Sequence, residues 1–252
     1  MEASGNAETN ARVSELTESY CETIYNMDME GDVVIGARLA EKFRVAPPTV
    51  TETLKRMVRD GYVEMNDRRQ VTLTPRGIRL AETILRRHRL TERFLVDMLG
   101  MQWHQVHEEA TRLEHHISGA VEERVVKALG HPLTCPHGNP IPGFVENART
   151  YLKDQGAVRL LTSGIDQPVR ILCVSEVVED EEEMISYLHD RNLTPGTVLT
   201  RVGAPVRLES ATEAGTGSDP GEPMVTLSVE GVPLVVAARV AYALWVVPVP
   251  QR

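Results

Sequence analysis

Hydrophobic residues recur at helical spacing through the first sixty positions and predict three short helices. We expect the first helix over residues 10–29, the second over 36–43 and the third from Pro48 to Arg59. Proline suits the first turn of a helix, because its missing N–H would be unpaired there in any case, and Gly61 suits a helix end. The third helix is therefore bounded at both ends by local sequence.

Alternating hydrophobic residues follow these helices and predict a two-stranded hairpin. The strands are expected at 62–65 and 70–73, around a polar turn at 66–69. Helix, helix–turn–helix and hairpin is the order of a winged helix-turn-helix domain, whose last helix enters the major groove of DNA. We therefore assign residues 1–74 to such a DNA-binding domain. A generic small α+β domain with the same pattern is the alternative.

Two longer amphipathic stretches come next and predict long helices. Thr74 and Pro75 begin the first, which we expect to continue to about Leu99, and the second is expected over residues 103–129. Two such helices after a small DNA-binding head are typical of a dimer interface, and helix-turn-helix proteins usually bind DNA as dimers. Residues 75–145 are accordingly interpreted as a helical dimerisation domain.

Short β-branched stretches dominate the last third of the chain. After a turn-rich region and a linker at 146–168, we expect short strands, one of them at 234–240, and one helix at 181–190. These elements lie in a domain at 169–252, and about 80 residues of short strands fit a small closed β-barrel. The predicted fold is thus multidomain and mainly α, with a β wing and a C-terminal barrel.

Charge is unevenly distributed along a chain whose net charge is −9. Residues 36–59 carry six Lys or Arg and two acids, whereas residues 176–190 carry seven acids and no Lys or Arg. A basic head on an acidic body suits a selective DNA-binding protein. There is no apolar run of roughly 18 residues and no signal-peptide pattern, and the three cysteines imply no disulfide framework. We expect a cytoplasmic protein with no membrane partner.

Potential metal ligands are concentrated on the predicted helices at spacings that place them on shared faces. These sets are His88 with Glu92; His107 with Thr111, Glu114 and His115; and Ser19 with Glu22. Imidazole and carboxylate together are typical ligands of Mn²⁺, Fe²⁺, Co²⁺, Ni²⁺ and Zn²⁺. The pattern therefore favours a divalent metal cofactor, although spacing alone does not pair the residues.

Two enzyme interpretations have less support in the sequence than the DNA-binding interpretation. The segment from His107 begins like a zinc-protease helix but has Thr111 where a second histidine is required. Cys135-Pro136-His137 has no second pair at matching spacing, so we interpret it as a proline-fixed turn. A metal-dependent hydrolase would also need an open coordination position beside a substrate cleft, and the sequence offers no nucleophile or oxyanion motif.

The chain resembles the diphtheria toxin repressor and iron-dependent regulator family, with a more distant likeness to manganese transport regulators. The resemblance is close over residues 10–145 and looser beyond. The segments that carry it are Ser19–Tyr25, Pro48–Val50, Arg59–Gly61, Arg87–Arg93, Val106–Ala110, Leu113–His115 and Gly138–Gly143. It implies an SH3-like (FeoA-like) C-terminal barrel and two metal sites per subunit.

The resemblance assigns His88, Glu92 and His107 to an ancillary metal site, which residues of the C-terminal domain complete. Glu181 is the candidate for one of these residues. Met184 falls where an amide is usual.

The primary, activating site would contain Glu114 and His115. The iron-type members have Met and Cys where this chain has Ser19 and Thr111, whereas Glu22 matches a carboxylate ligand of the manganese-type members. Hard oxygen ligands suit Mn²⁺. We therefore expect activation by Mn²⁺, with Fe²⁺ close behind, while Co²⁺, Ni²⁺ or Zn²⁺ substitute in vitro.

Six residues are expected to contact DNA: Ala46, Pro48, Thr49, Glu52, Arg59 and Arg69. Pro48, Thr49 and Glu52 would lie nearest the base edges, and the two arginines would contact phosphates. Compared with iron-type members, Ala46 replaces a Ser and Glu52 a Gln. Glutamate accepts from cytosine but cannot pair bidentately with adenine, so the operator preference should differ.

The sequence thus predicts a homodimeric, metal-activated repressor of metal-uptake genes, in which metal binding favours the DNA-competent state. Two dimers on one operator are compatible with this class. The main alternative is a winged-helix regulator whose primary metal site no longer senses metal and which is metal-independent or responds to another ligand.

Overall fold

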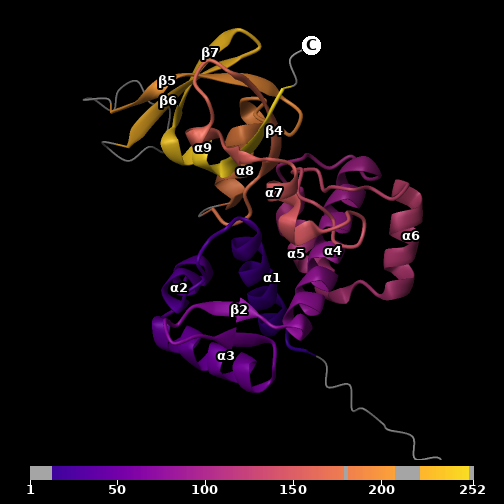
Figure 1. The fold of residues 1–252 in the computed structure, drawn as a ribbon. Helices are drawn as coiled ribbons and strands as arrows, with labels where there is room; N and C mark the ends of the chain where they lie inside the picture. The colour runs from indigo at the N-terminus through magenta and orange to yellow at the C-terminus, as the bar shows by residue number, and fades with distance from the viewer. Residues whose placement is uncertain (1–12, 179–180, 208–221, 250–252) are drawn as a thin grey trace, which may run out of the picture.

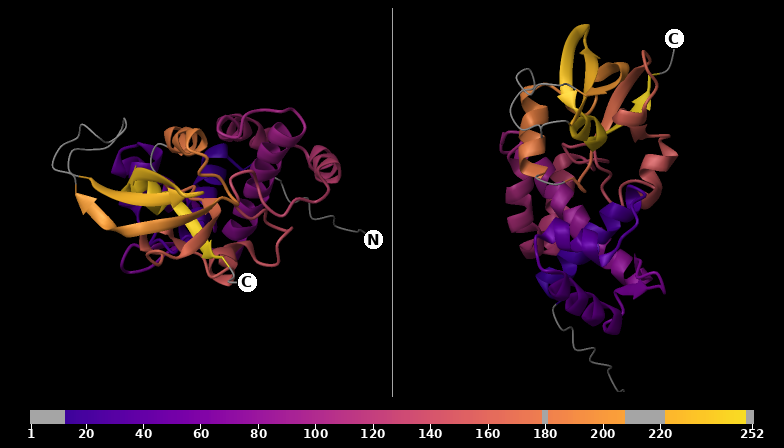
Figure 2. Two further views of the ribbon diagram at one scale, coloured as in Figure 1. Left: turned by 90° about the horizontal axis from the view of Figure 1, so that it is seen from above. Right: turned by 90° about the vertical axis from the view of Figure 1, so that its left-hand side faces the viewer.

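The computed structural model describes residues 13–178, 181–207 and 222–249. Figure 1 shows a three-part molecule with the C-terminal sheet at one end, the N-terminal domain at the other and a set of helices beside both. The right-hand view of Figure 2 gives the same arrangement from the side. None of the helices in these described ranges has the length and apolar character that crossing a membrane requires.

The N-terminal domain has the predicted winged-helix order. Its elements are α1 (Glu15–Met29), α2 (Gly36–Phe43), α3 (Pro47–Arg59), β1 (Val63–Met65) and β2 (Val71–Leu73). The two strands pair antiparallel and form the wing. The buried side chains of the core come from all three helices and both strands, and include Tyr20, Ile24, Leu39, Leu54, Met57, Val63 and Val71. The winged helix-turn-helix prediction is confirmed.

The helices of the second domain are less continuous than predicted. The first, α4 (Pro75–Asp97), begins at the expected Thr74 cap. The expected helix at 103–129 is wrong: the chain forms α5 (Val106–Leu113), a 3₁₀ turn η1 (Glu114–His116) and α6 (Gly119–Leu129). Ile117 is extended, and the Ser118 hydroxyl accepts from the Val121 N–H, so a new N-cap begins α6. This break matters because η1 carries two of the candidate ligands.

A loop region and short elements connect this domain to the C-terminal sheet. Residues 131–147 form the loop, and η2 (Ala148–Thr150) and α7 (Tyr151–Asp154) follow it. The next strand, β3 (Val158–Arg159), pairs with the last strand of the chain. Part of the segment expected to be a linker therefore contributes to the sheet.

The C-terminal sheet is antiparallel, with strand order β3-β8-β4-β5-β6-β7. Its further elements are β4 (Pro168–Val174), η3 (Leu160–Thr162), α8 (Glu181–Asp190), β5 (Val198–Arg207), β6 (Pro223–Val229), β7 (Val232–Ala237), α9 (Ala238–Ala243) and β8 (Leu244–Pro248). The end strands β3 and β7 do not pair with each other within the described ranges, so a closed barrel is not confirmed. The strand expected at 234–240 ends early, because alanine-rich residues favour α9.

Buried ion pairs join the three parts. The Glu30 carboxylate at the end of α1 accepts from Arg159 and from the Ser175 hydroxyl. Arg89 of α4 is fully buried and donates to Glu176, which also accepts from Asn26 of α1. A buried charge persists only where it is paired, so these contacts fix the orientation of α1 against α4 and the sheet.

Candidate metal centre

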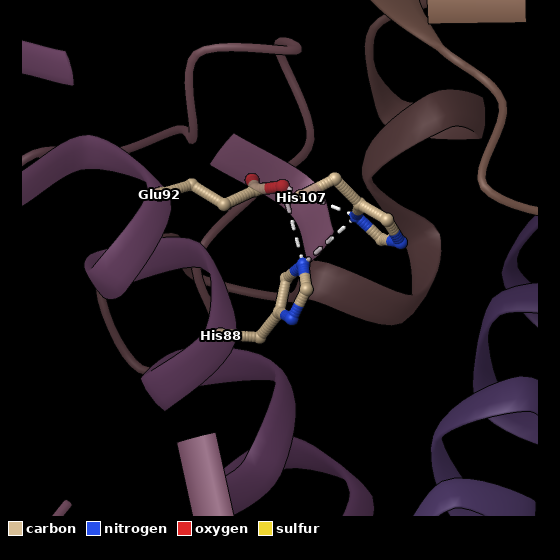
Figure 3. A group of neighbouring side chains, drawn as sticks. All are labelled: His88, Glu92 and His107. Atoms are coloured by element: carbon tan, nitrogen blue, oxygen red, sulfur yellow. Dashed lines mark hydrogen bonds and ion pairs between the residues drawn. The ribbon is translucent and has the colours of Figure 1, made fainter. Parts of the chain in front are cut away.

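Three side chains from α4 and α5 converge on one point, as Figure 3 shows. His88 and Glu92 lie one turn apart on α4 and are 2% and 0% exposed, and His107 lies near the start of α5. His88 Nε2 is 3.1 Å from Glu92 Oε1 and 3.1 Å from His107 Nδ1, and His107 Nδ1 is 3.3 Å from Glu92 Oε1. The structure thus brings together the three residues predicted for the ancillary site.

The donor set and its spacing fit a divalent cation. Ligand atoms bound at about 2.1 Å to one ion stand roughly 3.0–3.4 Å apart in octahedral or tetrahedral geometry. The other oxygen of Glu92, Oε2, is buried and has no hydrogen-bond partner among the described residues. A buried carboxylate oxygen without a partner is costly unless a cation satisfies it. The cluster is therefore better explained as a ligand set than as a hydrogen-bond network.

Charge in this cluster is tightly coupled. Burial would raise the pKa of Glu92, but the His137 and His88 imidazoles outweigh it and hold that pKa well below its ordinary value. Burial opposes a charge on His88, but the Glu92 and Glu114 carboxylates outweigh it and raise the His88 pKa well above its ordinary value. A bound cation would take the place of these protons, because ligating imidazoles must be deprotonated.

Cys135 and His137 extend the same cluster and also form the predicted turn, in which the Gly138 N–H donates to the Cys135 carbonyl. His137 Nδ1 is 3.1 Å from Glu92 Oε1 and 4.0 Å from the Cys135 sulfur. His137 Nε2 is 3.1 Å from the Trp103 carbonyl, which can only accept, so the N–H is at Nε2 and the lone pair of Nδ1 faces the cluster. Burial and then the Glu92 carboxylate raise the pKa of the Cys135 thiol well above its ordinary value.

The loop that carries these two residues is fixed by its glycine. Gly138 has φ 86°, and a Cβ there would lie 2.1 Å from the Leu172 carbonyl oxygen of the sheet. Only glycine allows this approach, so the sequence Cys-Pro-His-Gly is the local signal that could have identified the site. The resemblance pointed instead to the C-terminal domain. The side chain of Glu181 lies outside the described residues, and Met184 packs in the core of the sheet domain.

A second group of ligands lies where α1 meets η1 and α4. The ligand atoms of Glu22, His88 and Glu114 all lie within 4.8 Å of one another. Glu114 is buried, and its carboxylate reaches His88 Nδ1 at 2.5 Å and His115 Nε2 at 3.2 Å. The structure therefore brings Glu22 and Glu114, which were predicted for the primary site, together with His88. The predicted His115 contacts Glu114 but does not belong to this group of three.

The two hydroxyl side chains predicted for this site line its cavity of about 230 Å³ without pointing their protons into it. Ser19 Oγ donates to the Glu15 carbonyl and Thr111 Oγ1 to the His107 carbonyl, each within its own helix. Their oxygens are neutral, so they offer a cation no charge, unlike the carboxyl groups of Glu22 and Glu114 once these ionise. Burial and then the Glu114 carboxylate raise the pKa of Glu22 to about 8.

His88 belongs to both groups of ligands. One ring nitrogen faces Glu114 and the other faces Glu92 and His107. We call the group of Glu22, Glu114 and His115 the first cluster and the group of His88, Glu92, His107, Cys135 and His137 the second cluster. His88 Nδ1 is the direct link between them.

The predicted DNA-contacting residues lie on an exposed surface at the end of the molecule away from the C-terminal sheet (Figure 1). Ala46 caps α3, Pro48, Thr49, Glu52 and Arg59 follow along its exposed face, and Arg69 is exposed in the wing turn with φ 57°. The Glu52 carboxylate accepts from Lys55 at 2.7 Å. The structure thus leaves all six side chains accessible to DNA.

The architecture defines a class, that of winged-helix regulators with a metal-binding helical domain, and comparison with known proteins agrees. Residues 12–71 match the family profile described as iron dependent repressor, N-terminal DNA binding domain. Residues 74–143 match the one described as iron dependent repressor, metal binding and dimerisation domain.

Relatives and solved structures point the same way. The iron-dependent repressor IdeR of Mycobacterium tuberculosis is 40% identical over 189 residues, which cover 73% of this chain and 82% of IdeR. The diphtheria toxin repressor of Corynebacterium diphtheriae is 38% identical over 185 residues, 72% of this chain and 81% of that one. A manganese-dependent transcriptional repressor solved with manganese has TM-score 0.72 and 26% identity, covering 92% of this chain and 100% of its own.

The chain therefore belongs to the iron-dependent repressor family. This is a family of DNA-binding transcriptional repressors and not of enzymes, so the hydrolase interpretation is set aside. A helical dimerisation domain, as predicted, follows the DNA-binding domain.

Proposed function

We propose that this protein is a homodimeric repressor that binds operator DNA when Mn²⁺ or Fe²⁺ occupies the first cluster. The observation that carries the proposal is the position of that cluster. Glu22 comes from α1 of the DNA-binding domain, whereas Glu114 and His115 come from η1 of the helical domain, and Glu22 and Glu114 approach each other within 4.8 Å. A cation would join two domains whose facing carboxyl groups do not both ionise readily without it.

The charge state of Glu22 couples metal binding to the position of α1. In the metal-free protein Glu22 keeps its proton at neutral pH, because its pKa is about 8. Bound metal supplies positive charge that lets Glu22 and Glu114 ionise side by side. The ionised carboxylates then hold α1 against η1, and the state with α1 in place is the one that presents α3 to DNA. A ligand shifts such an equilibrium only by its differential affinity for the two states.

We assign the metal ligands as follows. Glu22, Glu114 and His115 form the primary site, with the hydroxyl oxygens of Ser19 and Thr111 on its wall. His88, Glu92 and His107 form the ancillary site, and Cys135 and His137 extend it. The carboxyl-rich primary site favours Mn²⁺ over Fe²⁺, while Co²⁺, Ni²⁺ and Zn²⁺ bind in vitro as most such sites allow. Glu181 is retained as a weak tether from the C-terminal domain.

The dimer and its operator complete the proposal. Exposed apolar side chains on the helical domain, Met98, Leu99, Leu113, Val121 and Leu133, supply an interface for a second copy. Residues 1–74, 75–145 and 169–252 are the functional units, joined through 146–168, and the C-terminal sheet acts as an SH3-like module. Two dimers bind one operator, and the protein acts in the cytoplasm, where operator DNA is found.

Readout of the operator is assigned to Pro48, Thr49 and Glu52, with Arg59 and Arg69 on phosphates. Glu52 accepts from a cytosine N4 amino group, and a good base contact discriminates by about 1–3 kcal/mol. In a randomised operator library, Glu52→Gln should therefore change the preference at one base pair. The same base preference in Glu52→Gln and wild type would contradict the assignment.

Anaerobic titration of operator binding with single divalent cations tests the proposal as a whole. We expect operator affinity to rise steeply with Mn²⁺ and to fall back when a chelator is added. Binding that is equally tight with and without metal would contradict the proposal and favour a metal-independent regulator instead.

A further inference from the structure

A carboxylate of α1 that is outside the predicted ligand sets contacts the first cluster. Glu18 lies on α1, one turn before Glu22, and its Oε2 is 2.7 Å from His115 Nδ1. Both side chains are largely buried, at 16% and 10% exposure. This contact joins α1 to η1 across 97 residues of sequence. It is thus a second bridge between the domains beside the one that a cation in the first cluster would make.

The direction of this hydrogen bond decides which ring nitrogen of His115 is available. An ionised carboxylate can only accept, so the proton of this contact belongs to Nδ1 of His115. In a neutral imidazole the lone pair is then on Nε2. That nitrogen is 3.2 Å from Glu114 Oε1, within the spacing expected of two ligands of one ion. Glu18 therefore presents His115 to the cation in the orientation that ligation requires.

The position of Glu18 on α1 connects this contact to the DNA-binding domain. Tyr20, two residues further on, is buried and its ring stacks on Phe43 of α2 at 4.2 Å between centroids. Glu18 and Tyr20 both lie within α1, so the backbone between them is rigid. A change in how Glu18 holds His115 therefore changes how α1, and with it α2, sits against the helical domain.

We propose that Glu18 is the positioning residue of the primary metal site: it fixes the Nδ1–H tautomer of His115, turns Nε2 to the ion and ties metal occupancy to the placement of α1. The proposal rests on the proposed primary site. It does not make Glu18 a ligand: its Oε2 accepts from the ring N–H, and Glu18 is not among the residues whose ligand atoms lie within 4.8 Å of one another at this site. A carboxylate behind a ligating histidine is a common arrangement, and its loss typically weakens metal binding by about 10–100-fold.

The test uses full-length protein labelled with ¹⁵N in its histidine rings and titrated with Zn²⁺, which is diamagnetic. The ¹⁵N shifts of His115 report which nitrogen carries the proton and which binds metal, and the titration of that signal gives the affinity of the primary site alone. In wild type we expect protonated Nδ1 and metal-bound Nε2. In Glu18→Ala we expect about 10–100-fold weaker Zn²⁺ binding at this site and loss of the single tautomer.

Two further variants separate positioning from ligation and from general damage. In Glu18→Gln the amide oxygen still accepts from Nδ1–H, so the tautomer should persist with an affinity within a few-fold of wild type. Glu15→Ala, an exposed position on the same helix, should behave as wild type.

An unchanged tautomer and affinity in Glu18→Ala would overturn the proposal. So would a loss in Glu18→Gln as large as in Glu18→Ala, because Glu18 would then be a ligand. A wild-type His115 signal that does not respond to Zn²⁺ would instead refute the primary site itself, and the role of Glu18 with it.

Discussion

The two clusters of ligands differ in the parts of the chain that they join. The second cluster draws its side chains from α4, α5 and the loop after α6, all within residues 75–145. The first cluster combines Glu22 of α1 with Glu114 of η1, which also contacts the neighbouring His115, and so spans the DNA-binding and helical domains. Occupancy of the first cluster therefore bears on how the DNA-binding domain sits, whereas occupancy of the second stabilises a domain that is already held together.

The two clusters also differ in their donor atoms. The second cluster offers three imidazoles, one carboxylate and one thiol, a set that suits Zn²⁺, Fe²⁺ and other later cations. The first cluster is dominated by carboxylates, which suit Mn²⁺. A cation bound only in the second cluster would not draw Glu22 and Glu114 together. From this comparison we expect the first cluster to act as the switch and the second as a supporting site.

Among these variants, removal of the Glu114 carboxylate should reduce the metal response of operator binding most. Glu114→Ala takes away a ligand of the first cluster and the partner of His88 Nδ1, so we expect metal-stimulated operator affinity to fall by about 100-fold, near the upper end of typical allosteric coupling. Glu108→Ala, an exposed glutamate on α5, is the matched control and should keep the full response. Operator binding by fluorescence anisotropy at saturating Mn²⁺ measures both. A full metal response in Glu114→Ala would remove the distinction between the clusters.

Changes in the second cluster should reduce metal content more than activation. In His137→Phe we expect one fewer tightly bound ion per subunit, with Mn²⁺-dependent operator binding weakened by about tenfold or less. In Cys135→Ser bound Co²⁺ should lose its thiolate charge-transfer absorption, while Cys173→Ser, another buried cysteine, should keep it. Metal analysis and absorption spectra measure these effects. Unchanged metal content in His137→Phe would show that this loop is a structural turn, as the sequence first indicated.

A smaller effect should appear in the stability of the metal-free protein. The pKa of Glu22 is raised to about 8, above its value in an unfolded chain, so the folded protein holds this proton more tightly. The stabilisation is fully present below the unfolded pKa and is lost as pH rises through about 8. Glu22→Gln removes this loss and should raise the melting temperature by a few degrees at pH 8 but not at pH 4.

The raised pKa of Glu22 also predicts that metal binding releases a proton. Since Glu22 must ionise to bind, Mn²⁺ affinity should increase between pH 6 and pH 8 in wild type and less steeply in Glu22→Gln, where only the ligating imidazoles still lose protons. Calorimetry in buffers of different ionisation enthalpy counts the protons released. Glu15→Gln on the exposed face of α1 is the control, and an equal pH dependence in Glu22→Gln would place the titrating group elsewhere.

Sequence patterns predicted the winged helix well because its helices and hairpin are short, capped and amphipathic. They failed between α5 and α6, where the apolar stripe continues through a break that only the Ser118 cap reveals. They predicted the turn at Cys135–His137 but not its contact with Glu92, because no periodicity places a loop against a helix and the contact depends on Gly138 packing on the sheet. Glu18 was missed for a similar reason, since its partner His115 is distant in sequence and helical spacing alone does not pair helices.

Anaerobic operator binding across free Mn²⁺ and Fe²⁺ concentrations, in wild type and His107→Ala, tests the central claim most directly. His107→Ala disables the second cluster and leaves the ligands of the first in place. We predict half-activation at lower free Mn²⁺ than Fe²⁺ in both proteins, with the Mn²⁺ response of His107→Ala within about tenfold of wild type. Half-activation at lower free Fe²⁺, or complete loss of activation in His107→Ala, would contradict the claim that the carboxylate cluster between α1 and η1 is the switch.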